Sequence, residues 1–268
     1  MFKTERQNDL KPALISMFRV IYALILREVK VRYGPLKIGF IWALLEPILF
    51  VCVLSIVFTI RRDSTVYGMP LLIFLLTGII PFLIFRNTMN RTMTAAKSNV
   101  ALLYFPQINP FEIVVARSIV EFVTVFIAFI TLCTLMHISG LAEIDIESPM
   151  KLLIIFMTMS LLGFSMGVAV GSWIPIFPMV EIITNIFIGR PLFFISGVFF
   201  TVEMLPIWVR EYLLLNPLFH LIEMFRSAFF ISFESQYTDL LYTTAFVLIL
   251  FFTSLVTQRA LRKYVIQI

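Results

Sequence analysis

The sequence is poor in charge, cysteine and histidine, and it lacks the motifs on which many enzymes depend. Only 14% of its 268 residues are charged and 60% are hydrophobic, whereas a soluble domain is about a quarter charged and half apolar. Cys52 and Cys133 both lie inside apolar runs, which favours neither a disulfide nor a metal site. No Gly-Lys dipeptide occurs, so the chain has no Walker A loop for ATP. We therefore expect a membrane protein that is not an enzyme and holds no metal or cofactor of its own.

Long apolar runs are what the sequence has in abundance. They are about 17 to 25 residues long, enough for an α-helix to cross the hydrocarbon core of a bilayer. A membrane β-barrel would instead show alternating segments of about ten residues. We predict an all-α membrane protein with six transmembrane helices, at residues 38–60, 69–85, 113–136, 150–172, 178–200 and 239–258.

Lysine and arginine residues predict the orientation of these spans. An even number of spans puts both termini on one side, and fifteen of the basic residues fall on that side, against five on the other. Loops rich in Lys and Arg remain in the cytoplasm. We expect a cytoplasmic N-terminal region at 1–37, a six-helix domain at 38–260 and a cytoplasmic tail at 261–268.

Residues 11–33 carry an amphipathic pattern. Apolar side chains such as Leu14, Phe18 and Ile21 recur every three or four positions, with Arg19 and Arg27 on the other face. This pattern predicts a helix lying in the membrane interface. A simple membrane anchor is the plainer interpretation.

Residues 201–238 are too polar to span a membrane and too apolar for an ordinary loop. Pro206 is expected to start one short helix, and Asn216-Pro217 to end it and start another. Two short helices dipping into the outer leaflet would form the mouth of a pathway, since irregular backbone at that depth needs a protein or water-filled surrounding. The candidate residues of these exit helices are Trp208, Arg210, His220, Glu223 and Arg226.

Arg190 lies in the middle of the predicted fifth span, directly before Pro191. A charge there costs roughly 2.5–3.5 kcal/mol on insertion scales, so it requires a partner or a wet cavity. Arg190 either meets an anionic substrate or pairs with one of the acidic residues inside spans. These are Glu46, Glu121 and Glu181.

Two further patterns concern packing. Arg117 precedes Glu121 by four residues, a spacing that predicts an ion pair on one helix. Gly163, Gly167 and Gly171 form a glycine stripe, which permits close contact between helices. Packing within the subunit is the first interpretation of the stripe, and a dimer contact is the second.

Residues 86–112 are expected to form a cytoplasmic loop that begins polar and becomes aromatic at Tyr104 and Phe105. Such a loop suits docking to a soluble partner. A solvated connector fits the composition equally well.

Three stretches together resemble a known family. The first is 27–42 followed by Glu46-Pro47, and the second is 103–106 followed by Asn109-Pro110. The third combines 196–200, 205–206 and 216–220 with Glu223 and Arg226. In this order and spacing they resemble the permease subunits of ABC-2 type polysaccharide exporters, most closely capsular polysaccharide export permeases (KpsM-type).

The resemblance implies an ABC-2 exporter fold and a set of partners. The permease would be a homodimer in a bacterial inner membrane, with two copies of a separate ABC ATPase that binds ATP and Mg²⁺. Its cargo would be an anionic polysaccharide on a lipid anchor, passed to periplasmic and outer-membrane export proteins. Membrane lipids are expected partners, and nucleic acid is not.

The resemblance also implies roles for single residues. A coupling helix within 86–112 would meet the ATPase, and the interface helix would attract the lipid phosphate of the substrate. The ATPase-coupling candidates are Arg91, Lys97, Tyr104 and Phe105. The candidates where substrate enters are Arg27, Lys30, Arg32 and Lys37, and the conduit candidates are Trp42 and Arg190.

Two alternatives stay open. The first is an ABC-2 permease for another substrate, such as O-antigen or teichoic acid. The second is a secondary transporter or channel that works without ATP, although the sequence shows no convincing internal repeat.

Overall fold

The computed structural model describes residues 10–34, 45, 47–54, 56–57, 65–66, 69–105, 108–141, 143–231 and 233–266. Lys37, Trp42 and Glu46 lie outside these described residues. The elements, in chain order, are α1 (Leu10–Tyr33), β1 (Thr65–Val66), β2 (Met69–Pro70), α3 (Leu71–Met93), η1 (Lys97–Asn99), α4 (Val100–Leu103), α5 (Pro110–Ile138), α6 (Pro149–Gly171), α7 (Met179–Ile183), η2 (Thr184–Gly189), α8 (Arg190–Ile195), η3 (Val202–Met204), α9 (Ile207–Leu213), α10 (Pro217–Phe229) and α11 (Leu240–Ile266). The two short strands pair antiparallel, with Thr65 opposite Pro70.

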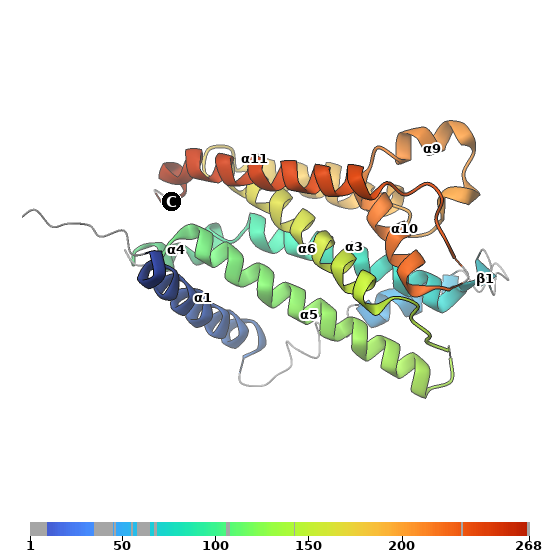
Figure 1. Cartoon of the computed structure of the whole chain (residues 1–268). Coiled ribbons are helices and arrows are strands. Elements are labelled where there is room, and N and C mark those ends of the chain that lie inside the picture. The colour runs from blue at the N-terminus through green and yellow to red at the C-terminus, as the bar shows by residue number, and fades with distance from the viewer. Residues whose placement is uncertain are drawn as a thin grey trace, which may run out of the picture.

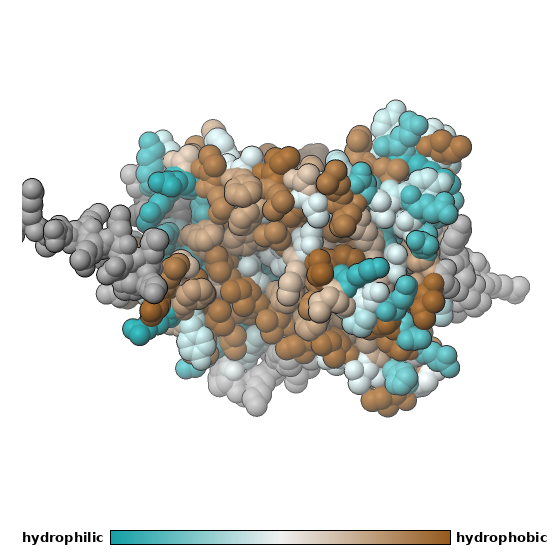
Figure 2. Space-filling model, viewed as in Figure 1, coloured by the Kyte–Doolittle hydropathy of each residue, from teal (hydrophilic) through white to brown (hydrophobic). Residues whose placement is uncertain are grey.

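Four helices, α3, α5, α6 and α11, are long and apolar enough to cross a membrane among the residues described. They run alongside one another through the length of the molecule (Figure 1). Figure 2 shows hydrophobic side chains over the middle of this face and hydrophilic ones toward both ends. The described structure is mostly helical, as predicted, and four of the six predicted spans are seen as single long helices.

The predicted fifth span, 178–200, is not one regular helix. It consists of α7, the π-helix η2 and α8, which follow one another without a gap. Pro191 has no backbone N–H, so it cannot bond the carbonyl of the residue four positions earlier. A π-turn is a local widening often found where the regular bonding ladder is interrupted. The π-helix η2 ends at Gly189, directly before Arg190 and Pro191. The interrupted bonding and the missing N–H of Pro191 therefore lie side by side in the chain.

Asn-Pro pairs start two of the helices. The Asn109 side chain accepts a hydrogen bond from the Phe111 N–H, and Glu112 Oε2 accepts one from the Asn109 N–H at 2.9 Å, which completes a capping box at the start of α5. Asn216 Oδ1 likewise accepts from the Leu218 N–H at 3.1 Å at the start of α10. The predicted pair of short helices, broken at Asn216-Pro217, is confirmed as α9 and α10.

The core is centred on α3, which is buried on nearly every side. The α6 glycines lie against its backbone, because a Cβ added at Gly163 would overlap the Phe85 carbonyl and one at Gly171 would lie 2.7 Å from the Met93 oxygen. Small residues allow this close approach of helices. Packing within the subunit, the first interpretation of the glycine stripe, is confirmed.

The segment predicted as a loop from residue 86 begins later. Helix α3 continues through Met93, because Met89, Thr92 and Met93 are buried against α6. The charges of Arg86 and Arg91 suggested a loop, but tertiary packing extends the helix. The connection to α5 is therefore 94–109, and it contains η1 and α4.

Candidate functional site

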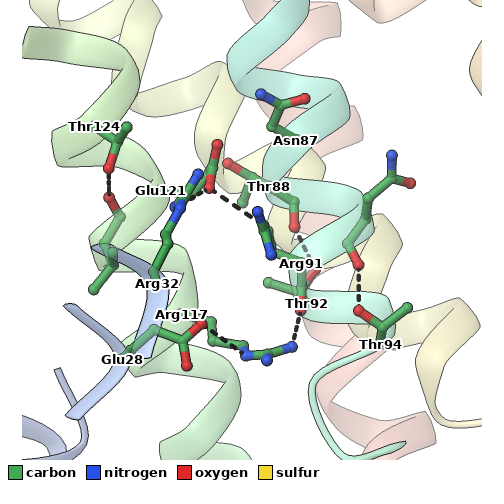
Figure 3. Close-up of polar contacts among 12 residues, drawn as sticks. Glu28, Arg32, Asn87, Thr88, Arg91, Thr92, Thr94, Arg117, Glu121 and Thr124 are labelled. Atoms are coloured by element: carbon green, nitrogen blue, oxygen red, sulfur yellow. Dashed lines mark hydrogen bonds and ion pairs between the residues drawn. The ribbon is translucent and has the colours of Figure 1, made fainter. Parts of the chain in front are cut away.

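A group of charged side chains joins α1, α3 and α5 (Figure 3). We call it the charged network, and its members are Glu28, Arg32, Arg91, Arg117 and Glu121. Arg32 Nη1 lies 2.6 Å from Glu121 Oε2, and Arg91 Nε lies 3.7 Å from the same oxygen. Arg117 Nε lies 3.2 Å from Glu28 Oε1. The network fastens the predicted interface helix to two long helices.

The predicted pair between Arg117 and Glu121 is wrong. Glu121 pairs with Arg32, and Arg117 pairs with Glu28. Both helices carry opposite charges four residues apart, so each charge meets a partner on the neighbouring helix rather than on its own. Spacing along one helix could not predict these pairs, because Arg32 and Glu121 are 89 positions apart in the sequence.

The pair of Arg32 and Glu121 is a partly desolvated contact. The Glu121 side chain is only 1% exposed and that of Arg32 is 16% exposed. Burial alone would lower the pKa of Arg32, but the adjacent Glu121 carboxylate outweighs it and raises that pKa. Removing Glu121 would leave the Arg32 charge largely buried without this carboxylate, which costs up to about 3–5 kcal/mol. Removing Arg32 should cost less, because Arg91 lies 3.7 Å from the same Glu121 oxygen.

The connection between α3 and α5 touches both α1 and α7. Arg27 Nη1 donates to Asn99 Oδ1 at 2.7 Å, and Lys97 Nζ lies 2.9 Å from Glu181 Oε2. Tyr104 and Phe105 are 80% and 60% exposed. An exposed aromatic pair therefore lies next to these contacts.

The four candidate residues for substrate entry differ in their contacts and exposure. Arg27 and Arg32 are held by Asn99 and Glu121, Lys30 is exposed, and Lys37 lies outside the described part of the chain. Among the described candidates, Lys30 therefore presents its charge openly, while Arg27 and Arg32 join α1 to the rest of the protein.

A second polar group lies at the other end of the molecule, and we call it the α10 cluster. Its centre is Arg226, which is fully buried. Nη1 of Arg226 donates to the carbonyls of Gly197 at 2.6 Å and Phe200 at 3.2 Å, and Nη2 donates to that of Val198 at 2.8 Å. The guanidinium carbon lies 4.1 Å from the Phe74 ring centroid, within cation–π range.

Glu223 and His220 complete the α10 cluster. Glu223 Oε1 lies 3.4 Å from Arg226 Nη1, and burial raises the pKa of Glu223 to about 7. His220 Nε2 lies 2.7 Å from the Leu214 carbonyl and therefore carries the proton, since Nδ1 accepts from the Asp239 N–H at 3.2 Å. All three predicted exit residues on α10 are buried and hold the local structure together.

The two remaining exit candidates lie on α9. Trp208 is 70% exposed. Arg210 donates to the carbonyls of Leu205 and Glu203 and to the Tyr237 hydroxyl. Trp208 is thus the exit candidate that offers a free aromatic surface.

Arg190 does not pair with Glu121 or Glu181, which bind Arg32 and Lys97 instead. The alternative of an ion pair with either of them is wrong, and Glu46 lies outside the described residues. Arg190 is exposed and lines a pocket of about 350 Å³. Glu28, Asn99 and Phe74 have partners in distant parts of the chain, so no local sequence pattern indicated their roles.

Comparison with known proteins adds a family and several relatives. The family model of the ABC-2 type transporter matches residues 19–230. The polysialic acid transport protein KpsM of Escherichia coli is 29% identical over 239 residues, which cover 89% of this chain and 92% of that protein. The capsule polysaccharide export inner-membrane protein CtrC of Neisseria meningitidis serogroup B is 32% identical over 79% of each chain. The corresponding inner-membrane protein BexB of Haemophilus influenzae is 28% identical over 84% of each chain.

Proposed function

We propose, since the chain belongs to the ABC-2 type transporter family, that it is the membrane-spanning permease of an ATP-driven exporter of capsular polysaccharide. The observation that carries this function is the similarity, over most of the chain, to inner-membrane proteins named for capsule polysaccharide export. The long apolar helices are consistent with it. The cargo we propose is an acidic polysaccharide on a lipid anchor, in keeping with the relative named for polysialic acid transport.

We assign ATP hydrolysis to a separate subunit. The chain has no Walker A loop, so ATP and Mg²⁺ would bind to an ABC ATPase that docks on the permease. We propose a homodimer of this chain with two copies of that ATPase. The exposed pair Tyr104 and Phe105 supports a docking surface on 94–109.

The proposed orientation in a bacterial inner membrane places both termini in the cytoplasm. The excess of Lys and Arg on that side supports it, as does the position of α1, α4 and the end of α11 at one end of the molecule (Figure 1). Residues 38–60 and 178–200 would supply the remaining two of six spans. Helices α9 and α10 would then be re-entrant helices at the periplasmic exit.

A mechanism follows from the contacts of 94–109. ATP binding would close the partner dimer and move this connection. Asn99 and Lys97 would pass the movement to α1 and α7, which they contact through Arg27 and Glu181. Lys30 and Lys37 would attract the lipid phosphate of the substrate at the cytoplasmic surface. Periplasmic and outer-membrane export proteins would receive the polymer beyond the exit helices.

Co-purification with the ATPase encoded beside this gene, followed by an ATPase assay in lipid, tests the proposal. The double variant Tyr104→Ala, Phe105→Ala should lose the ATPase, because it removes the exposed aromatic surface. The matched control is Trp208→Ala, a similarly exposed aromatic at the other end, which should retain the complex. A chain that purifies alone and transports without ATP would make it a secondary transporter or channel. Complementation of a capsule-deficient strain distinguishes capsular polysaccharide from O-antigen or teichoic acid.

A further inference from the structure

A pocket of about 350 Å³ lies between α3 and the irregular segment η2–α8. This size falls within the range of pockets that hold small molecules. Its lining residues are Arg86, Asn90, Asn185, Gly189, Arg190, Phe193 and Phe194. Two guanidinium groups, two amides and two aromatic rings thus line one pocket between helices.

The described residues supply no ion pair for the charge of Arg190. It has no hydrogen-bond or ion-pair partner among the described residues, and no carboxylate lines the pocket. Asn90 Oδ1, on the opposite wall, is a buried acceptor without a hydrogen-bond partner. A buried polar atom of this kind is costly unless a ligand or water completes it. The pocket is therefore lined by Arg190, for which the described residues supply no partner, and by Asn90, whose buried Oδ1 is unsatisfied.

One wall of the pocket is irregular backbone. Asn185 and Gly189 belong to the π-helix η2, and such turns are often found at functional sites. A Cβ added at Gly189 would meet only the Thr184 carbonyl oxygen at 3.9 Å, so close packing does not demand this glycine. Phe193 is held in place by ring contacts with Phe82 and Phe199 at 5.0 and 4.9 Å.

We propose that this pocket binds the acidic sugar units of the translocated polymer, an inference that rests on the proposed export function. Arg190, with Arg86 nearby, binds the carboxylate or phosphate of a sugar unit through charge-assisted hydrogen bonds. Asn90 and Asn185 bind hydroxyl or amide groups of the same unit. Phe194, which is 63% exposed, offers its ring to the apolar face of the sugar.

The oxyanion could also come from a lipid headgroup, but the lining of the pocket favours the glycan. The two amides and the aromatic wall match a sugar better than a bare phosphate.

The test uses the complex with its ATPase in nanodiscs and two fluorescent probes that differ in the carboxylate alone. One is a short oligomer of glucuronic acid and the other a glucose oligomer of equal length. Arg190→Gln should weaken binding of the acidic probe about tenfold or more, since a hydrogen bond to a charged group contributes about 1.5–3 kcal/mol. Binding of the glucose oligomer should not change. The control Arg19→Gln removes an exposed arginine on α1 and should leave both affinities unchanged.

A second variant keeps the test decisive if the first one misfolds. If Arg190→Gln fails to assemble with the ATPase, Asn185→Asp introduces a repulsive carboxylate into the same pocket and should reduce binding of the acidic probe alone. Unchanged affinity for the acidic probe in an assembled variant would overturn the site, as would a wild-type complex that shows no preference for the acidic oligomer. Displacement of that probe by phosphatidylglycerol, but not by phosphatidylcholine, in wild type alone would assign the pocket to lipid headgroups instead. A wild-type complex that fails to export capsule would refute the exporter function itself. Normal export by wild type, together with unchanged binding of the acidic probe by Arg190→Gln, would refute only the proposed binding site.

Discussion

Replacing Arg226 by methionine should strongly destabilise the protein. Methionine keeps most of the volume of the side chain and removes its hydrogen bonds and charge. Three carbonyl groups, of Gly197, Val198 and Phe200, would lose their donor in a buried site. The Glu223 carboxyl group would lose its cationic neighbour at the same time.

The magnitude follows from the burial of this site. Arg226 and Glu223 are both 0% exposed, so water cannot replace the lost contacts. Each unsatisfied buried polar group costs about 1–3 kcal/mol, and truncating one partner of a buried ion pair costs about 3–5 kcal/mol in total. Since these costs overlap, we expect about 3–5 kcal/mol for Arg226→Met. Arg226→Lys should lose less, because an ammonium keeps the charge but cannot donate to three carbonyls in the same fork.

Equilibrium unfolding of the purified protein in mixed detergent micelles measures the effect. The matched control is Arg210→Met, since Arg210 also donates three hydrogen bonds but its side chain reaches solvent. We expect a loss of about 1 kcal/mol for that control. If both variants lose equal stability, or if Arg226→Met unfolds like wild type, the assignment of Arg226 as the centre of the α10 cluster is incorrect.

Three further predictions concern packing, pairing and pH. Gly167→Ala should cost about 1–3 kcal/mol or more in thermal stability, since its Cβ would overlap the Met89 carbonyl oxygen; an unchanged melting curve would contradict the close contact of α3 and α6. A double-mutant cycle with Arg32→Gln and Glu121→Gln should give a coupling energy of about 1–3 kcal/mol, and additive effects would rule out their direct pairing. The pKa of Glu223 is raised by burial to about 7, so the stability it contributes is present below about pH 4.5 and is lost as pH rises toward 7. Glu223→Gln should therefore show a flatter stability profile between pH 5 and pH 8 than wild type, and parallel profiles would exclude this titration.

The long helices could be predicted because their signal is local. Apolar runs of sufficient length define α3, α5, α6 and α11, and the proline after an asparagine marks where α5 and α10 begin. The resemblance to ABC-2 permeases was also visible in short motifs, and the family match confirms it. Each of these features depends on residues that are near one another in the sequence.

The ion pairs could not be predicted, because their partners lie far apart in the sequence. Spacing along α5 suggested Arg117 with Glu121, but the neighbouring helix α1 carries a complementary pair of charges and takes both. The same limit explains α10, where Arg226 looked like a residue of an open mouth. Its partners are carbonyl groups of a turn that precedes it by more than twenty residues, and no local sequence pattern predicts them.

The contacts differ in kind between the centre of the protein and the elements around it. Helices α3 and α6 meet through glycines with almost no space between their backbones, so one cannot slide past the other without a clash. By contrast, η1 is attached to α1 and α7 by single polar contacts, of Asn99 with Arg27 and of Lys97 with Glu181. Such exposed or half-exposed contacts contribute little stability and can be exchanged at small cost. If transport requires the chain to change shape, the change should therefore occur at η1 and α7–α8, around a core of α3 and α6 that stays fixed, while buried ion pairs hold α1 against α5. The pocket at Arg190 lies on that boundary, between α3 and the segment η2–α8, so a shift of α8 would change the distance between its two walls.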